Sequence, residues 1–101
     1  MLKMIIYDIE VVIVNENLVS IGKGYLNHND RDTIKSWNIE LYDVRNENIF
    51  SEILHGTNDA TLKIGTLDGK SFIGRSIITK LEIGPLGTTV LLKGNGPLYE
   101  A

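Results

Sequence analysis

The chain has 101 residues, 43% of them hydrophobic, with a formal net charge of −3 and no cysteine. This length suits a single domain, residues 1–101, with a modest core, and the missing cysteines exclude disulfides, thiolate metal sites and thiol nucleophiles. The sequence pI of about 5.3, with lysine and arginine scattered singly, argues against a nucleic-acid surface, which needs a clustered basic field.

The first predicted strand covers residues 1–15, where β-branched residues predominate. Because strand side chains alternate between faces, one face carries a long apolar stripe made of Ile5, Tyr7, Ile9, Val11 and Ile13. The opposite face begins polar and becomes apolar at Val12 and Val14. These two valines are either covered by another layer of the protein or available to a partner, so both are candidate binding residues.

A polar turn at residues 15–17 precedes a second predicted strand, residues 18–27, in which Gly22 and Gly24 interrupt the alternation. Glycines inside a strand indicate a sharp bend or the close approach of another segment. The polar loop that follows, residues 27–32, lacks the spaced ligands, the glycine and the closing glutamate of a calcium loop. We therefore predict a solvated loop without a metal.

The third predicted strand lies within residues 33–44, where Trp37, Ile39 and Leu41 align on one face. The only tryptophan of a small β domain is usually a core residue whose indole N–H is hydrogen-bonded, although it can also form a stacking platform for a ligand. An aromatic ligand-binding face would carry Tyr7, Tyr25, Trp37 or Tyr42, and the last three are the candidate binding residues.

Helical spacing of apolar residues interrupts the strand pattern in residues 46–56 and predicts one short helix over residues 47–55. Asn46 or Asn48 can cap its start, and Gly56 can end it in the left-handed conformation.

Residues 60–94 predict three strands joined by two tight turns. The dipeptide Asp68-Gly69 is typical of a type I′ hairpin turn, which needs positive φ at both central residues. Gly74 is a plausible site for a β-bulge in the long middle strand. The second turn, residues 84–87, places Pro85 where its fixed φ suits a turn.

These patterns predict an all-β fold, a small antiparallel β-barrel or β-sandwich of about six to seven strands with one short helix near residues 47–55. The choice between barrel and sandwich stays open, because the strand order is not visible. Neither His28 nor His55 lies in the local context of a known catalytic motif, and acidic side chains on strands are usually solvated. We therefore expect no catalytic residue, no cofactor and no enzyme activity.

The carboxyl-terminal third carries two alternating runs of small and apolar residues, namely Phe72, Gly74, Ser76, Ile78, Thr79 and Leu81, then Thr88, Val90, Leu92, Gly94, Gly96 and Leu98. These runs resemble the closing hairpin of tail-tube proteins from long-tailed phages, which often ends in Gly-x-Gly-x-Leu, here GNGPL. The resemblance implies a ring-forming structural subunit whose sheets join edge to edge, and it assigns no catalytic residue. The chain is equally similar to small uncharacterised β-barrel proteins of bacteria and their prophages.

Two classes of function follow. The first is a non-enzymatic structural or protein-interaction module, for example a self-assembling subunit of phage or prophage type, that uses sheet edges or the apolar end of the first strand. The second is a small β-barrel that binds an oligosaccharide or a single nucleic-acid strand on an aromatic-bearing face.

The expected partner is a second copy of the chain or another protein, with nucleic acid disfavoured by the acidic charge. No membrane contact is expected, because no segment reaches the length of a membrane span. The expected location is the cytoplasm, or the virion where the phage resemblance applies.

Overall fold

The computed structural model describes residues 4–29 and 36–100. These residues form seven strands and one helix, which confirms the predicted all-β fold with a short helix near residues 47–55. The strands are β1 (Met4–Val14), β2 (Asn17–Val19), β3 (Lys23–Asn29), β4 (Trp37–Tyr42), β5 (Ala60–Thr66), β6 (Ser71–Gly84) and β7 (Gly87–Glu100), and the helix is α1 (Asn48–His55).

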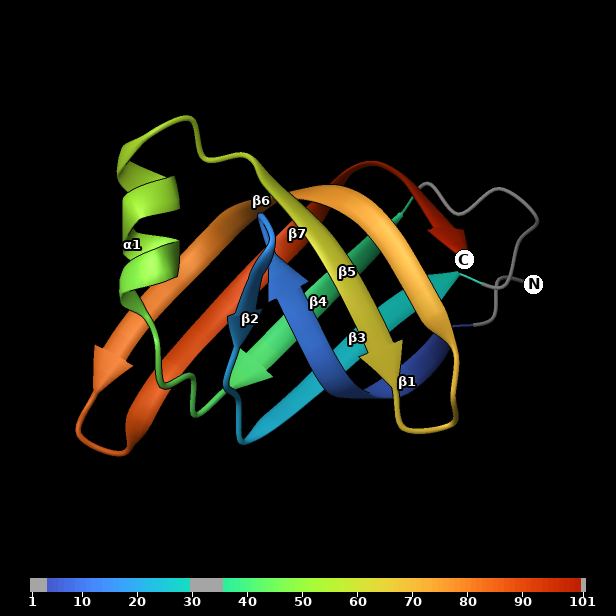
Figure 1. Cartoon of the computed structure of the whole chain (residues 1–101), viewed down its shortest axis with the longest axis horizontal. Coiled ribbons are helices and arrows are strands. Elements are labelled where there is room, and N and C mark those ends of the chain that lie inside the picture. The colour runs from blue at the N-terminus through green and yellow to red at the C-terminus, as the bar shows by residue number, and fades with distance from the viewer. Residues whose placement is uncertain (1–3, 30–35, 101) are drawn as a thin grey trace.

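The strands form one antiparallel sheet in the order β2-β1-β3-β4-β7-β6-β5, and an additional pairing of β1 with β5 closes it. The result is a six-stranded barrel with β2 as an extra strand on β1 (Figure 1). Closure decides between the two predicted architectures in favour of the barrel. In the described ranges, no helix has the length and apolar composition needed to cross a membrane.

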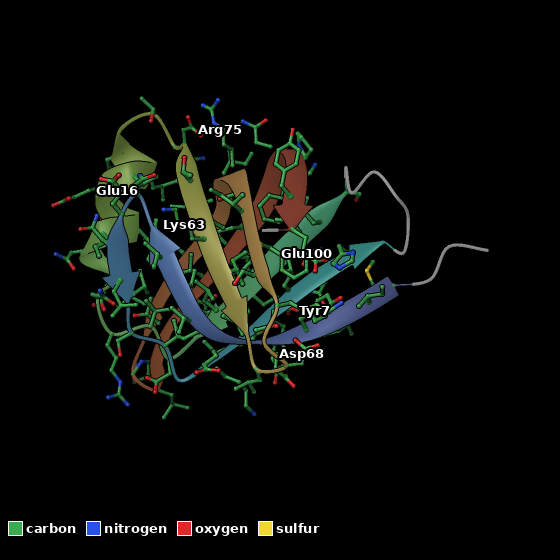
Figure 2. All side chains as sticks on the ribbon, turned by 45° about the vertical axis from the view of Figure 1, so that its right-hand side comes forward. Tyr7, Glu16, Lys63, Asp68, Arg75 and Glu100 are labelled. Carbon is green, nitrogen blue, oxygen red and sulfur yellow. The ribbon has the colours of Figure 1, made fainter. Side chains whose placement is uncertain are left out.

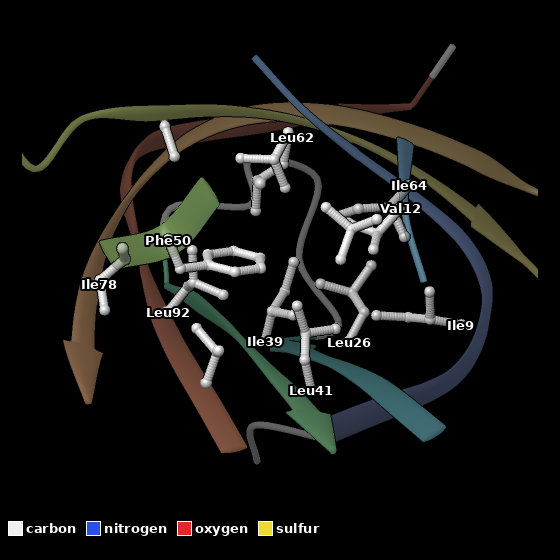
Figure 3. Close-up of a cluster of buried hydrophobic side chains, with 14 of the residues drawn as sticks. Ile9, Val12, Leu26, Ile39, Leu41, Phe50, Leu62, Ile64, Ile78 and Leu92 are labelled. Atoms are coloured by element: carbon white, nitrogen blue, oxygen red, sulfur yellow. The ribbon is translucent and has the colours of Figure 1, made fainter. Parts of the chain in front are cut away.

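A register shift in β1 between Ile9 and Val11, in its pairing with β5, reverses the faces of this strand. Ile9 is buried before the shift, whereas after it Val12 and Val14 are fully buried and Val11 is exposed. Figure 3 shows Ile9 and Val12 both pointing into the same core. The predicted apolar stripe is therefore wrong beyond Ile9, because the extra residue of the bulge moves every later side chain to the opposite face.

The core fills the inside of the barrel, and α1 contributes to it from one end. Phe50 on α1 is fully buried and reaches toward Ile39 and Leu92 in Figure 3. The other buried apolar residues come from the inner faces of the strands and from Val44. The Phe50 ring covers the open end of the barrel and keeps water out of the core. The structural role of α1 is therefore to place this ring.

The ends of α1 differ from the prediction. Its first flanking residue is Glu47, which makes no capping hydrogen bond through its side chain, and Gly56 has a φ of −97° in place of a left-handed value. The positive φ falls on Asn58, at 51°. The predicted asparagine cap is therefore wrong, because the Asn46 side chain is engaged elsewhere, at the edge of β2. Gly56 ends the helix as predicted, but its left-handed conformation is wrong.

The predicted second strand is split into β2 and β3, as its glycines indicated. A Cβ built on Gly22 would lie 2.8 Å from Asp43 Cβ, and one built on Gly24 would lie 2.9 Å from Ile21 Cδ1. Both glycines thus allow the close approach of another segment at a bend. Residues 27–29 of the predicted polar loop extend β3, and residues 30–35 lie outside the described ranges.

The two-residue turn with positive φ occurs at a different place from the predicted one. Asn15 and Glu16, between β1 and β2, have φ values of 46° and 71°, as a type I′ turn requires. The turn between β5 and β6 covers residues 67–70, and there only Gly69 has a positive φ, of 90°. The hairpin at Asp68-Gly69 is confirmed, whereas its type I′ geometry is wrong. The bulge predicted at Gly74 is wrong in its position, because the extra residues between Gly74 and Ser76 lie on β7, whereas the extra residue of β6 is Thr79, between Ile78 and Lys80.

Asn46 acts as a partner for the outer edge of β2. Its Oδ1 accepts from the Ser20 N–H at 2.9 Å, and its Nδ2 donates to the Leu18 carbonyl at 3.1 Å. We expect Asn46→Ala to lower the free energy of unfolding by about 1–2 kcal/mol, because two hydrogen bonds to strand backbone are lost at a half-exposed site. Urea unfolding measures the change. Asn48→Ala, at an exposed residue of α1, is the control and should change the free energy of unfolding by less than about 0.5 kcal/mol.

Candidate functional site

Three of the five predicted binding residues lie in the core. The exposed fractions of Val12 and Val14 are 0%, and that of Trp37 is 3%. Buried side chains cannot contact a partner of the folded chain, so the predicted docking surface at the two valines is wrong, for the bulge moves them inward. The core interpretation of Trp37 is confirmed, and its Nε1–H donates to the Gly96 carbonyl at 2.9 Å.

The tryptophan ring packs against two glycines of the β6–β7 hairpin. A Cβ built on Gly94 would lie 2.5 Å from Trp37 Cε2, and one built on Gly74 would lie 2.8 Å from Trp37 Cζ2. Contacts this short do not occur for real side chains, so the indole occupies the volume that any larger residue would need. Trp37 therefore stabilises the core of the barrel and is not part of an aromatic face on its outer surface.

The other two predicted residues, Tyr25 on β3 and Tyr42 on β4, meet on the outer face of the barrel. Both are half-buried, and their ring centroids lie 6.2 Å apart with an interplanar angle of 65°, an edge-to-face pair. The register places Tyr25 opposite Glu40 and Lys23 opposite Tyr42. Glu40 thus lies beside both rings.

A hydrogen-bonded network joins the two strands here. The Tyr42 hydroxyl donates to Glu40 Oε1 at 2.8 Å, while Asn27 Nδ2 donates to Glu40 Oε2 at 2.9 Å and to Asn38 Oδ1 at 2.8 Å. The bond to the Glu40 carboxylate, followed by partial burial, raises the pKa of Tyr42. We call this set the tyrosine face: Tyr25, Asn27, Asn38, Glu40 and Tyr42.

Beside the tyrosine face the surface is hollowed where β4, β7 and β6 meet. The hollow has a volume of about 380 Å³, and the outward side chains around it come from Asn38, Glu40, Thr79, Leu91 and Lys93. Leu91 lies opposite Glu40 in the pairing of β4 with β7, and Lys93 lies opposite Asn38. The hollow thus combines one aliphatic floor residue with carboxylate, amide, hydroxyl and ammonium groups.

A second exposed feature is the end of the β6–β7 hairpin, which extends away from the barrel in Figure 1. Leu86 is 98% exposed and Ile83 is 65% exposed. The two side chains form what we call the hairpin tip. The turn at residues 84–87 was predicted from the sequence, but the exposed apolar surface formed by Leu86 was not. The signal was present, because leucine is an unusual turn residue between Pro85 and Gly87.

A groove crosses the outside of β5, β6 and the last part of β7, far from the hairpin tip in Figure 1. It has a volume of about 370 Å³ and is bounded by Thr61, Ile73, Gly74, Arg75, Asn95, Gly96, Pro97 and Tyr99. Tyr99 is 61% exposed. We call this feature the Tyr99 groove, and its walls are mainly apolar because Ile73 and Pro97 also lie outward.

The Arg75 guanidinium at the Tyr99 groove pairs with the Asp59 carboxylate, which raises the pKa of Arg75. Figure 2 shows Arg75 and Lys63 on the same side of the molecule. Because the arginine already has a carboxylate partner in the chain, the groove offers apolar contact more than a cation for an acidic ligand.

Tyr7 pairs with Leu26, next to Tyr25 in the register, but it lies on the inner face of the sheet and so apart from the tyrosine face. Its ring stacks on His28, with centroids 5.4 Å apart, and the Lys70 ammonium lies 5.5 Å from the centroid of the Tyr7 ring. The hydrogen bond to Tyr7 and the nearby carboxylate of Glu100 raise the pKa of Lys70. The cluster covers the end of the barrel that α1 leaves open.

The residues suited to acid–base or metal chemistry are dispersed. His28 is buried against Tyr7, whereas His55 is exposed at the end of α1, where its Nδ1 lies 2.8 Å from the Ser51 carbonyl oxygen. Across residues 4–29 and 36–100, no three His, Asp or Glu side chains converge as metal ligands. The surface features of the described residues are thus a tyrosine face, an apolar tip and an apolar groove.

The fold and these surfaces define the chain as a small closed antiparallel β-barrel with one extra strand and one helix. Comparison with protein-family models, with curated proteins and with solved structures found no match to this chain.

Proposed function

We propose that this chain is a non-enzymatic structural module that joins copies of itself through the hairpin tip and the Tyr99 groove. The observation that carries the proposal is the exposure of Leu86, 98%, at the end of a hairpin that extends beyond the barrel. A fully exposed leucine with a neighbouring exposed isoleucine forms an apolar patch at a position that soluble monomers normally fill with polar residues.

The two surfaces are complementary in chemistry. The hairpin tip presents two aliphatic side chains, and the Tyr99 groove presents an aromatic ring, an isoleucine and a proline around about 370 Å³ of space. The charged side chains near each surface are paired within the chain. Near the hairpin tip, Lys80 pairs with Glu82 at 3.0 Å, and at the Tyr99 groove, Arg75 pairs with Asp59. Burial of apolar area therefore supplies the favourable free energy of contact, at about 25 cal/mol per Å² before the cost of association.

The geometry supports a head-to-tail contact. Tip and groove lie on different parts of one rigid barrel, so the tip of one copy has to enter the groove of another. A heterologous contact of this kind closes into a ring or continues as a filament. A ring-forming subunit of phage or prophage type is one version of this function.

Sheet-edge pairing is a less favourable route to assembly. The β1–β5 pairing closes the barrel, and the Asn46 side chain occupies the outer edge of β2. Both features reduce the unpaired backbone that an added strand needs. The proposal therefore assigns the contact to side chains of the tip and groove.

Sedimentation velocity of Leu86→Asp tests the proposal. We expect the unchanged chain to show a mean mass that rises with concentration above the 11.3 kDa of one chain, and Leu86→Asp to stay at one chain. Leu67→Asp is the matched control, because Leu67 is a 64% exposed leucine in the β5–β6 turn, and it should assemble like the unchanged chain. Equal assembly by the two variants, or a monomer in every case, would overturn the proposal.

A further inference from the structure

We propose that the tyrosine face, with the hollow beside it, is a binding site for a neutral oligosaccharide. This inference is independent of self-assembly, because the tyrosine face lies on β3 and β4 and shares no residue with the hairpin tip or the Tyr99 groove.

The aromatic pair supplies the apolar part of such a site. A pyranose ring has a face of C–H groups, which pack on the negative face of an aromatic ring. Tyr25 and Tyr42 are half-buried, so each ring is held in place while part of it stays accessible, and their 65° angle presents two surfaces of different orientation. Leu91, half-buried opposite Glu40, extends the apolar floor into the hollow.

The polar groups are arranged for hydroxyl groups. Vicinal sugar hydroxyls are read by an acceptor and a donor placed side by side, and planar carboxylate and amide groups provide this in fixed geometry. The bonds from Tyr42 and Asn27 hold the Glu40 carboxylate in one orientation, and each of its oxygens keeps a further lone pair. Asn38 accepts from Asn27 through Oδ1 and keeps its Nδ2 to donate, next to Lys93.

Charge favours a neutral ligand over a nucleic acid. The outward residues on and beside this face include two acids, Asp8 and Glu40, and two bases, Lys23 and Lys93, so the formal charges cancel. Binding to a phosphate backbone requires several uncompensated cations along the ligand path. A sugar chain without charge meets no such requirement, and the fixed polar groups can be satisfied by its hydroxyls.

Isothermal titration calorimetry with three hexasaccharides, cellohexaose, chitohexaose and maltohexaose, tests this site, with a six-nucleotide oligothymidylate as the competing class. We expect saturable binding of at least one hexasaccharide. Tyr42→Ala and Glu40→Gln should each weaken that binding by about tenfold, since one removes a stacking ring and the other the ordered acceptor. Leu67→Ala, at an exposed leucine of the β5–β6 turn that belongs to neither proposed surface, is the control and should bind with unchanged affinity.

Circular dichroism verifies that each variant is folded. If a variant is unfolded, Tyr42→Phe, which keeps the ring and removes only the hydroxyl, is used in its place. Loss of the hydroxyl is expected to weaken binding about threefold. The proposal is overturned if no hexasaccharide binds at millimolar concentration. It is equally overturned if binding is insensitive to the Tyr42 and Glu40 variants, or if the oligothymidylate binds more tightly than the sugars.

Discussion

Replacing Gly94 with alanine is expected to lower the free energy of unfolding by about 3 kcal/mol, close to the upper end for an overpacked core. The added methyl group would lie 2.5 Å from Trp37 Cε2 and closer still to Nε1. The indole is 3% exposed and surrounded by packed residues, so it must move as a whole, and it then loses the hydrogen bond to the Gly96 carbonyl. Chemical unfolding followed by tryptophan fluorescence measures the loss.

Gly65→Ala is the control for this experiment. Gly65 also lies in a strand, on β5, but a Cβ built there would come no closer than 3.7 Å to another residue, Val11. Its replacement should raise the stability by less than about 1 kcal/mol, because alanine lowers the conformational entropy of the unfolded chain relative to glycine. Similar losses at Gly94 and Gly65 would show that the tryptophan does not pack over the β6–β7 hairpin as described.

Val12→Asp is expected to prevent folding altogether. Val12 is fully buried, and an unpaired carboxylate in an apolar core costs more than about 4 kcal/mol, a large part of the roughly 5–15 kcal/mol that stabilises a domain of this size. Circular dichroism and size-exclusion chromatography should show an expanded chain without strand signal.

The neighbouring variant, Val11→Asp, is the matched control for the bulge in β1. Val11 is 38% exposed, so its carboxylate reaches water, and the variant should fold with a loss below about 1 kcal/mol. The opposite result, in which Val11→Asp unfolds and Val12→Asp folds, would mean that β1 runs without a register shift and that Val12 faces outward.

Much of the fold could be predicted because its signals are local. The apolar spacing that gives α1 and the turns at Asp68-Gly69 and Pro85 each depend on a few neighbouring residues. The tryptophan was placed correctly in the core by residue type alone. These features need no knowledge of which strands pair.

The face reversal in β1 could not be predicted, because it depends on pairing. The register shift between Ile9 and Val11 arises where β1 passes from β3 to a closing strand, β5, distant in sequence. The alternation of side chains in a single strand gives no sign of a bulge, so the prediction continued the same alternation past Ile9. It therefore placed Val12 and Val14 on the face opposite Ile9, although they lie in the core with it. The choice between barrel and sandwich could not be made from the sequence for the same reason, because it depends on the pairing of β1 with β5.

The candidate sites were predicted only in part. Tyr25 and Tyr42 were recognisable as aromatic residues on consecutive predicted strands, and the pairing of β3 with β4 brings them together. Asn27 and Glu40 were missed, since their meeting depends on the β3–β4 register. The Tyr99 groove was missed for a similar reason: its walls come from three strands.

Mixing two variants tests the proposed assembly most directly. Leu86→Asp keeps the Tyr99 groove and loses the tip, whereas Tyr99→Asp keeps the tip and loses the groove. Each alone is expected to have the 11.3 kDa mass of one chain. An equimolar mixture should form a one-to-one complex of twice that mass, measured by light scattering, and grow no further. A mixture that stays at the mass of one chain, like its separate components, would contradict a tip-in-groove contact between copies.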